Sequence, residues 1–588
     1  MQKRFIQIWK MIWGFSKSYV ILTILSKGIS LISSFLILYF NKLLINEISN
    51  TIINQTLEGS SVLTIIIITL SLDMLAVLLL SMFQYHMGKQ KIKYDDKMII
   101  FIALSISGLD MTYYDDPNHY NQTNLAYQYS NSIMNIFNKV IDFIFSIITL
   151  LIAITLVSSI SASLFILVLL SVIPSFLVRK HINQRNFQFS KNTTQDKRYT
   201  DYLASLMLNK SIIREMQVFN TQQYFKNKTE EYQEKYRHLR ISNSIKNARC
   251  EFAIMAFEKS ISFIQQVLLI MSIIKKALTI GDYSYIGGVL AKLKSSFNQV
   301  LILINELQIA DKQYQDFSLT INRKPYISSK GSINVPTNPN IIEFKNVSFK
   351  YPNTNKYALH NVSFKYAFND RIALVGPNGS GKSTLIKLLL RFYDPSEGAI
   401  LLNGIDVKEY NLQQYRSIYS VMFQEPLIYG LSIEENIALC DPKHIDADKI
   451  KEILNMLKFH PDIDYKRYYG REFSPDGYVF SLGEQQKLFS ARTLYHSRNL
   501  FILDEPAASM DALSEHEFFD ALNDYTDKCG LIYITHRYGI LRNMDKILVL
   551  DKGELIEQGT HMELITNQGL YSQIYELQEG EFNENHGV

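Results

Sequence analysis

The chain has 588 residues, more than one hydrophobic core usually supports, so we expect at least two domains. Its formal net charge of +4 is small for this length, which argues against a nucleic-acid partner. The three cysteines, Cys250, Cys440 and Cys529, lie far apart without a CxxC pair, so neither a disulfide framework nor a zinc site is indicated and we interpret them as reduced thiols.

The first half of the chain contains apolar segments long enough to cross a membrane. Tyr19–Phe40 carries one charge, Lys27, and can span a hydrocarbon core of about 30 Å at about 1.5 Å per residue. It is too long for a signal peptide and lacks a small-residue cleavage site. On the same grounds we predict five further spans, at Ser61–Phe83, Ile136–Val157, Ile160–Val178, Phe252–Ile274 and Tyr285–Asn305.

Charged residues in or near these spans are candidates for lining a cavity, because a charge facing lipid is costly. Pairing between helices, or snorkelling to the membrane surface, explains them equally well. The sixth span is the most polar, so we expect it to face protein or water. The candidates are Lys27, Asp73, Glu258, Lys259, Lys292 and Lys294.

Lys and Arg are concentrated between the fourth and fifth spans, where Arg179–Cys250 holds fifteen of them, while the short connections hold few. Such residues stay on the cytoplasmic side, so we predict that both termini and the two long loops, His86–Asn135 and Arg179–Glu251, are cytoplasmic. The loops are too rich in Tyr, Phe, Leu and Ile to be disordered, which favours helical extensions. Their tips would carry Tyr113–Pro117 and Ile213–Phe219.

A change in composition marks the end of the membrane domain. The stretch from Asn322 to Asn340 is rich in Pro, Ser, Gly and Asn and has no apolar periodicity, which is typical of a linker. We therefore predict a transmembrane domain at 1–320, a linker at 321–340 and a nucleotide-binding domain at 341–588.

The soluble domain contains a strand, a glycine-rich loop and a helix in direct succession. Arg371–Val375 reads as a buried strand and Leu385–Leu390 as a helix. Between them lies Gly376-Pro377-Asn378-Gly379-Ser380-Gly381-Lys382-Ser383-Thr384, in the context that a phosphate-binding loop requires. The glycines let backbone N–H groups surround the β-phosphate, Lys382 reaches the β- and γ-oxygens, and the Ser383 hydroxyl ligates magnesium. ATP and Mg²⁺ are the expected cofactors.

A second apolar strand, Leu500–Leu503, leads into Asp504 and Glu505. A carboxylate in this place can hold magnesium, and the next can orient or deprotonate the attacking water. We assign Asp504 to the metal and Glu505 to the catalytic base. Acids after a strand are a weak signal alone and gain their value from the phosphate loop. The predicted fold class is a membrane α-helical bundle of six spans with long cytoplasmic extensions, followed by an α/β P-loop NTPase domain.

From Ile341 to Glu576 these residues resemble the ATP-binding cassette (ABC) family. The resemblance implies that Tyr351 stacks on adenine and that Gln424 is the Q-loop glutamine, counted among the catalytic and metal-binding groups. It also implies that His536 is the switch histidine, whose imidazole can donate to the γ-phosphate as charge develops. Asp511, in Ser509-Met510-Asp511, matches the D-loop and is assigned to the ATP site.

The family's signature, normally Leu-Ser-Gly-Gly-Gln, is altered in this chain to Phe480-Ser481-Leu482-Gly483-Glu484. The resemblance implies that Ser481 and Gly483 meet the γ-phosphate bound by a facing subunit. Leu482 fits only if the backbone angles at its position suit a side chain, and Glu484 would repel phosphate unless it points away. The strength and symmetry of the contact are therefore left open.

Six spans followed by one cassette resemble bacterial half-transporters of the exporter type. The resemblance implies that the chain is a multi-pass protein of the cell membrane and that it works as a dimer. A homodimer is favoured because the chain keeps Lys382, Asp504, Glu505 and His536, and a heterodimer is the alternative. In this resemblance ATP draws the cassettes together, the loop tips carry the motion to the spans, and the cavity turns from cytoplasm to outside.

The segment Tyr469–Gly477 and the loop Tyr113–Pro117 resemble exporters of lantibiotics and related modified peptides, so a peptide is the expected substrate. The first span begins near Tyr19 with no cysteine-protease domain before it, so another protein would cut any leader. The alternatives are export of a lipid or hydrophobic drug, uptake, and ATP-gated signalling or immunity without solute transport.

Overall fold

The protein is described from a computed structural model. The structure describes residues 2–54, 60–115, 126, 129, 132–160, 162–275, 278–323, 325–327, 331–352, 354–424, 426–459, 463–472, 474–496, 498–506, 518, 522, 529–535 and 538–585. The chain divides into two compact units, Met1–Ser107 with Gln122–Asn322 and Gly108–Asn121 with Arg323–Val588.

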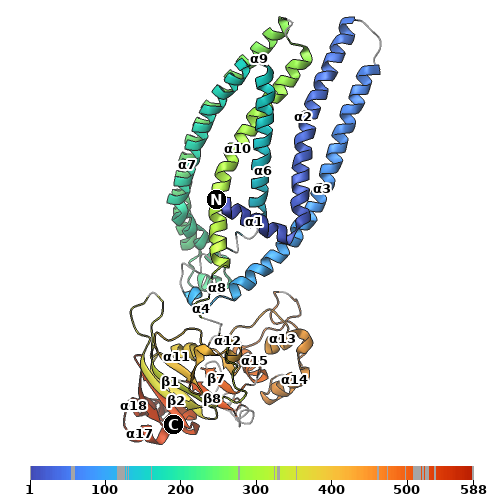
Figure 1. Cartoon of the computed structure of the whole chain (residues 1–588). Helices are drawn as coiled ribbons and strands as arrows, with labels where there is room; N and C mark the ends of the chain where they lie inside the picture. Colours follow the sequence, from blue (N-terminus) through green and yellow to red (C-terminus); the bar gives the residue numbers. More distant parts are fainter. Residues whose placement is uncertain are drawn as a thin grey trace. The chain divides into compact units, whose positions relative to one another are not determined.

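The first unit is built of long helices (Figure 1). The longest, α9, has 53 residues and so measures about 80 Å at about 1.5 Å per residue, far more than a bilayer core of about 30 Å. The predicted helical extensions are therefore confirmed. The helices are α1 (Gln2–Phe15), α2 (Lys17–Asn54), α3 (Ser60–Ser107), α6 (Ser132–Ile160), α7 (Ala162–Leu206), α8 (Lys210–Val218), α9 (Gln222–Ile274) and α10 (Ile280–Ile321).

Five helices among the described residues are long and apolar enough to cross a membrane, and they correspond to the first five predicted spans. The sixth predicted span, Tyr285–Asn305, lies within α10. This segment is helical but less apolar than the others, because Lys292, Lys294 and several polar residues interrupt it. The five helices are Lys17–Ile53, Ser60–Ser107, Ile133–Ser159, Ile166–Asn186 and Gln222–Ile274.

Polar contacts join neighbouring helices of this unit. The ammonium of Lys27 on α2 lies 2.6 Å from a carboxylate oxygen of Asp142 on α6. Lys294 on α10 donates to the hydroxyl of Ser262 on α9 at 2.7 Å, and Glu258 on α9 accepts from a serine hydroxyl on α7. Three of the cavity candidates, Lys27, Glu258 and Lys294, are thus engaged between helices, as the pairing interpretation expects.

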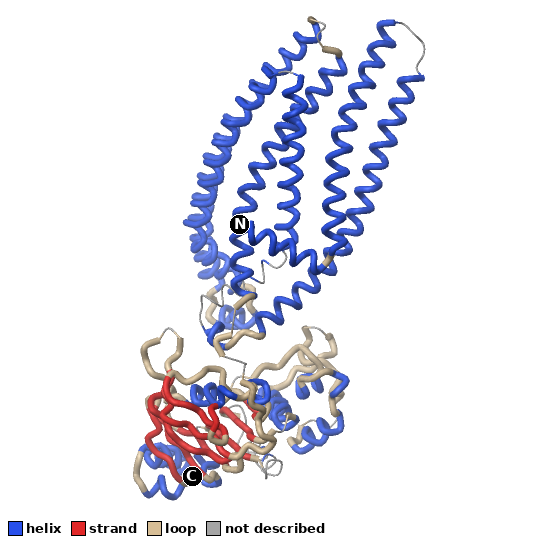
Figure 2. The backbone as a smooth tube through the Cα atoms, viewed as in Figure 1, coloured by secondary structure: helices blue, strands red, loops and turns tan. Residues whose placement is uncertain are grey.

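The second unit contains the α/β domain, with strands gathered in one region of the tube drawing (Figure 2). One sheet is antiparallel with the order β2-β1-β4-β5, and the other has the order β10-β9-β3-β8-β7-β6. In the second sheet all neighbours run parallel except β10 and β9. The strands are β1 (Ile341–Phe349), β2 (Leu359–Ala367), β3 (Arg371–Val375), β4 (Glu397–Leu402), β5 (Ile405–Asp406), β6 (Tyr419–Met422), β7 (Leu500–Asp504), β8 (Gly530–Ile534), β9 (Lys546–Asp551) and β10 (Glu554–Gly559).

Helices of this unit surround the sheets, and most of them are short. Both predicted strands, β3 and β7, are present, although β7 runs one residue further than expected and ends at Asp504. The predicted helix after the loop begins earlier, at Lys382. The α-helices are α4 (Met111–Asp115), α11 (Lys382–Leu389), α12 (Leu412–Arg416), α13 (Ile433–Ala438), α14 (Ala447–Met456), α15 (Leu482–Tyr495), α17 (His561–Thr566) and α18 (Leu570–Asn585). The 3₁₀ turns are η1 (Val407–Glu409), η2 (Pro442–His444) and η3 (Tyr538–Asn543).

The helix α4 packs against the cassette of the same unit, although more than 200 residues separate them along the chain. The Asp110 carboxylate, just before α4, accepts a hydrogen bond from the Ile327 N–H at 3.0 Å. The Tyr113 ring lies 4.7 Å from that of Tyr326, and Asp115 accepts from the hydroxyl of Tyr393. Asp116 and Pro117 of this predicted tip lie outside the described residues.

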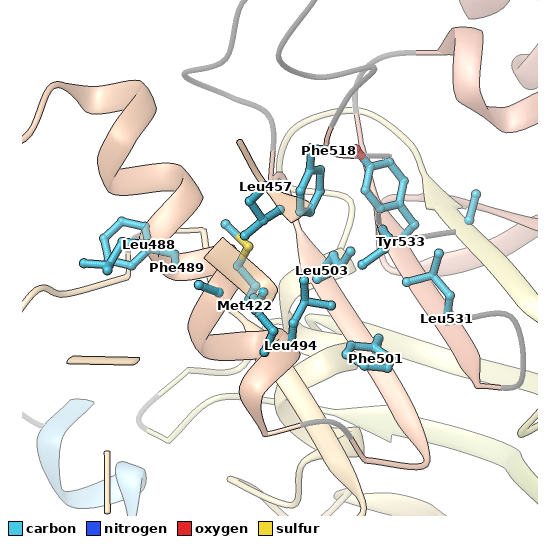
Figure 3. Close-up of a cluster of buried hydrophobic side chains, with 14 of the residues drawn as sticks. Met422, Leu457, Leu488, Phe489, Leu494, Phe501, Leu503, Phe518, Leu531 and Tyr533 are labelled. Atoms are coloured by element: carbon cyan, nitrogen blue, oxygen red, sulfur yellow. The ribbon is translucent and has the colours of Figure 1, made fainter. Parts of the chain in front are cut away.

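Both faces of the parallel sheet are buried. Alternate residues of β7 enter two different hydrophobic clusters, Phe501 and Leu503 one of them and Leu500 and Ile502 the other. Figure 3 shows the first cluster, in which Leu494 of α15 and the β7 side chains lie together. This packing holds the carboxyl ends of β3 and β7 in place, and the candidate site is built on these ends.

Candidate functional site

The loop after β3 has positive φ at each of its three glycines. Gly376, Gly379 and Gly381 have φ of 147°, 78° and 105°. A Cβ on Gly376 would lie 2.1 Å from the Leu550 carbonyl oxygen, and one on Gly381 would lie 2.7 Å from a Leu359 methyl. Both the dihedrals and the space therefore require glycine at Gly376 and Gly381. Asn378 and Gly379 at the turn of the loop are exposed.

Lys382 begins α11 and folds back across the loop. Its ammonium donates to the carbonyl oxygens of Gly376 at 2.8 Å and Pro377 at 3.0 Å. The residue is 7% exposed, and burial lowers its pKa, while the carboxylates of Glu505 and Asp504 oppose that shift. A cation is thus held beside a loop of backbone N–H groups at a helix N-terminus, where an anionic ligand is favoured.

Three hydroxyls surround the start of α11 in different environments. Ser383 is exposed, whereas Thr384 is buried and shares a hydrogen bond of 3.1 Å with the Tyr351 hydroxyl. Ser380 is buried, and its Oγ has no hydrogen-bond partner among the described residues. The exposed Ser383 hydroxyl is therefore the one of the three that a metal ion in solution can reach.

Two carboxylates stand at the end of β7. Asp504 is 8% exposed, and burial together with the neighbouring Glu505 charge raises its pKa to about 6, with Lys382 opposing. The Glu505 backbone has a positive φ of 51°, and its N–H donates to the Ile534 carbonyl at 3.0 Å. Its carboxylate accepts from the Gln424 amide at 3.0 Å. The structure thus brings Gln424 into contact with Glu505, which follows Asp504 in the chain.

These groups fit a magnesium ion. Mg²⁺ is usually held by one or two protein oxygens together with substrate phosphates and waters. Ser383 and Asp504 supply such oxygens, and a nearby cation would relieve the unfavourable burial of the Asp504 charge. Among the described residues no group of three or more His, Cys, Asp or Glu forms a metal site made by protein alone.

Tyr351 lies among aromatic rings next to α11. Its ring is close to perpendicular to those of Phe349 and Tyr393, at centroid distances of 5.0 and 5.5 Å. The Lys387 ammonium lies over the ring at 5.4 Å. The hydrogen bond to Thr384 fixes the ring against the phosphate loop, so an adenine stacked on it would be held at a set distance from the phosphates.

The altered signature forms the start of α15. Ser481 is its N-cap, and Leu482, which is 68% exposed, is its first helical residue, so the leucine fits without strain. Apart from its own helix and chain neighbours, no atom of the described residues lies within 4 Å of where a Cβ on Gly483 would stand. The Glu484 carboxylate turns back and accepts from the Ser481 N–H at 2.7 Å and from its hydroxyl at 2.8 Å. Phe480 is buried against aromatic rings, which explains its departure from leucine.

Two predicted site residues, Asp511 and His536, lie outside the described residues. Tyr393 and Lys387, which contact Tyr351, belong to no sequence motif and were not predicted. The way Glu484 is held was not predicted either, although a Ser followed three residues later by Glu is the capping-box pattern. That pattern was visible in the sequence and predicts the inward turn of the carboxylate.

Known proteins resemble the chain at several levels. Residues 359–508 match the family model described as ABC transporter. The subtilin transport ATP-binding protein SpaT of Bacillus subtilis is 27% identical, over 90% of this chain and 87% of its own length. The nisin transport ATP-binding protein NisT of Lactococcus lactis subsp. lactis is 25% identical, over 98% and 96%.

Other matches are more local or show the fold alone. An ATP-dependent lipid A-core flippase of Coxiella burnetii is 35% identical, but over only 40% of each chain. A solved structure of a bacterial Atm1-family ABC exporter with ATP bound superposes with a TM-score of 0.77 and 19% identity, over 95% of this chain and 97% of its own. The predicted fold, a helical membrane unit joined to an α/β nucleotide-binding unit, is confirmed by this likeness.

Proposed function

We propose that this chain, which belongs to the ABC transporter family, is one half of an exporter that uses ATP hydrolysis to move a peptide across the cell membrane. The observation that carries the proposal is the juxtaposition of Lys382 in the glycine loop with Asp504 and Glu505, in a chain that also contains a unit of long apolar helices. ATP binds at this loop, and its hydrolysis drives transport.

In the proposed site, different residues bind the phosphates, bind the metal ion and accept a proton. The N–H groups of 376–384 and the Lys382 ammonium bind the phosphates. Ser383 and Asp504 would hold Mg²⁺, with Gln424 as a further ligand, and the ion would supply positive charge to offset that of the phosphate oxygens. Glu505, oriented by Gln424, accepts the proton of the attacking water.

Three further roles come from the family resemblance. Tyr351 stacks on adenine, and its attachment to Thr384 supports a fixed placement of the base. Asp511 and His536, beyond the described residues, are proposed to complete the site, His536 as a donor to the γ-phosphate. These assignments are testable one residue at a time.

We further propose that the site is completed by a second subunit. Ser481 begins α15, whose N-terminal N–H groups favour an anion, and Gly483 beside it leaves open space. Since its own subunit does not require a glycine there, close approach by a ligand on a facing copy gives a reason for it. A homodimer suffices, because one chain carries both the loop and the signature, and a heterodimer is the alternative.

The proposed topology follows the charge distribution. Both termini and the nucleotide-binding domain, taken as 341–588, lie in the cytoplasm, and the membrane domain at 1–320 spans the bilayer in contact with lipid. Binding of ATP favours closed cassettes and substrate favours the inward cavity, so each ligand shifts the equilibrium by its differential affinity.

A peptide is the proposed substrate because the relatives that align along almost the whole chain are named for subtilin and nisin transport. The lipid A-core flippase aligns over 40% of the chain, so its name bears less on the membrane unit, where substrate is recognised. Lipid export remains the second candidate.

The test uses the full chain in lipid discs and in inverted vesicles. Hydrolysis of ATP should be stimulated by a lantibiotic-type precursor peptide, and the peptide should accumulate inside the vesicles. Glu505→Gln should abolish both while ATP binding persists. If peptide neither stimulates hydrolysis nor accumulates, while a lipid does, the peptide assignment fails; if no solute moves although ATP binds, transport itself is refuted.

A further inference from the structure

Glu484 occupies hydrogen-bond donors that the signature needs for another purpose. Its carboxylate accepts from both the N–H and the hydroxyl of Ser481, at 2.7 and 2.8 Å. The Glu484 N–H in turn donates to the Ser481 Oγ at 3.3 Å. A serine hydroxyl has one hydrogen to donate, so the Ser481 hydroxyl cannot serve this carboxylate and a phosphate at once.

Among the described residues of this unit the same capping box is also found at Ser432 with Glu435 and at Thr560 with Glu563. In each, the glutamate accepts from the cap N–H, at 2.9 and 2.8 Å. The arrangement is therefore an ordinary way of starting a helix. Only at α15 do the capped donors also belong to the signature.

We propose, resting on the function proposed above, that Glu484 restrains closure of the ATP site by competing with the γ-phosphate for the Ser481 N–H and hydroxyl. Two effects act in the same direction. The phosphate must displace a charged acceptor from its donors, and charge-assisted bonds are stronger than neutral ones. The carboxylate also offsets the positive N-terminus of α15 and repels the phosphate directly.

Because of this restraint, the two cassettes of the dimer stay apart at ATP concentrations that would otherwise bring them together. Closure then depends on additional favourable contacts, such as those made when substrate occupies the membrane unit. Glu484 acts through Ser481 and is therefore a positioning residue, with its effect on the binding of ATP between subunits and little effect on the chemical step.

The test is Glu484→Gln in the full chain in lipid discs. Glutamine also completes a capping box, so the substitution removes the charge and keeps the helix start. The concentration of ATP that half-saturates hydrolysis should fall about five- to tenfold, with kcat changed less than twofold. Tenfold corresponds to about 1.4 kcal/mol. Glu563→Gln, which makes the same change in α17, is the matched control and should leave the half-saturating concentration unchanged.

Each outcome has a distinct meaning. An unchanged half-saturating concentration in Glu484→Gln, with hydrolysis still dependent on Lys382, overturns the restraint and leaves the proposed function standing. An equal shift of the half-saturating ATP concentration in Glu563→Gln also overturns the restraint, because a change in helix capping away from the signature would then explain the effect. Absence of Lys382-dependent hydrolysis in the unsubstituted chain refutes the proposed function instead.

Discussion

Replacing Gly483 with alanine should leave the stability of the single subunit intact and impair ATP hydrolysis by the assembled dimer. Gly483 is the second residue of α15 and is not among the positive-φ glycines. In the part of the chain that the structure describes, no atom outside its own helix and chain neighbours lies within 4 Å of the place where a Cβ would stand. Alanine is favoured over glycine in helices by roughly 0.5–1 kcal/mol, and by less in a first turn. The free energy of unfolding should therefore stay the same or rise by up to about 0.5 kcal/mol.

Hydrolysis should respond in the opposite direction. A methyl group on the exposed side of the signature would displace a facing phosphate by about 1 Å, and a displacement of this size costs up to about 100-fold in rate. We expect hydrolysis to fall about 10- to 100-fold. Gly376→Ala gives the contrast, since its Cβ would lie 2.1 Å from the Leu550 carbonyl, and it should lose both stability and activity.

The measurements are ATP hydrolysis in lipid discs and denaturant unfolding followed by circular dichroism. An unchanged rate of hydrolysis in Gly483→Ala would refute the proposal that a phosphate bound by the facing subunit closely approaches this glycine. A loss of more than about 1 kcal/mol in stability would contradict the open space around it.

Three further predictions concern the cassette. The pKa of Asp504 in the folded protein, about 6, exceeds the ordinary value of an aspartate, so the nucleotide-free protein loses stability as the pH rises through about 4 to 6. Asp504→Asn should therefore raise the free energy of unfolding at pH 7.5 by on the order of 2 kcal/mol, and this gain should vanish below about pH 4. The same substitution should abolish ATP hydrolysis. Tyr351→Phe removes only the bond to Thr384 and should cost about 1 kcal/mol in denaturant unfolding, whereas Tyr351→Ala should also weaken ATP binding about tenfold in a titration. Arg391 is 1% exposed and bonds Asp394 and the Val407 carbonyl, so Arg391→Lys, which lacks the planar fork, should destabilise by about 2–3 kcal/mol; a stable lysine variant would contradict this.

Local patterns in the sequence predicted the phosphate loop and its strand well. In the strand Arg371–Val375 the last four residues are buried, and the required glycines follow at once, so each residue's environment is set by its near neighbours. Asp504 and Glu505 were predictable for the same reason. The roles of the individual residues stay predictions until they are tested.

Contacts between distant segments were not predictable from one sequence. The Tyr351 bond to Thr384 and the Asp115 contact with Tyr393 depend on how strands and helices pack, and no periodicity encodes that. The span at Tyr285–Asn305 was uncertain because composition alone cannot tell which face of α10 meets lipid.

The placement of α4 with the cassette affects how the ATPase can be isolated. A protein fragment starting at Ile341 would carry every phosphate-binding motif, yet it would lack Asp115 and leave Tyr393 uncovered. Since Tyr393 packs against Tyr351, the missing neighbour lies only one ring away from the proposed adenine contact. Kinetic constants measured on such a fragment would therefore describe an ATPase that lacks the contact between Asp115 and Tyr393. Adding a peptide of residues 108–121 to the fragment would be a way to restore this contact.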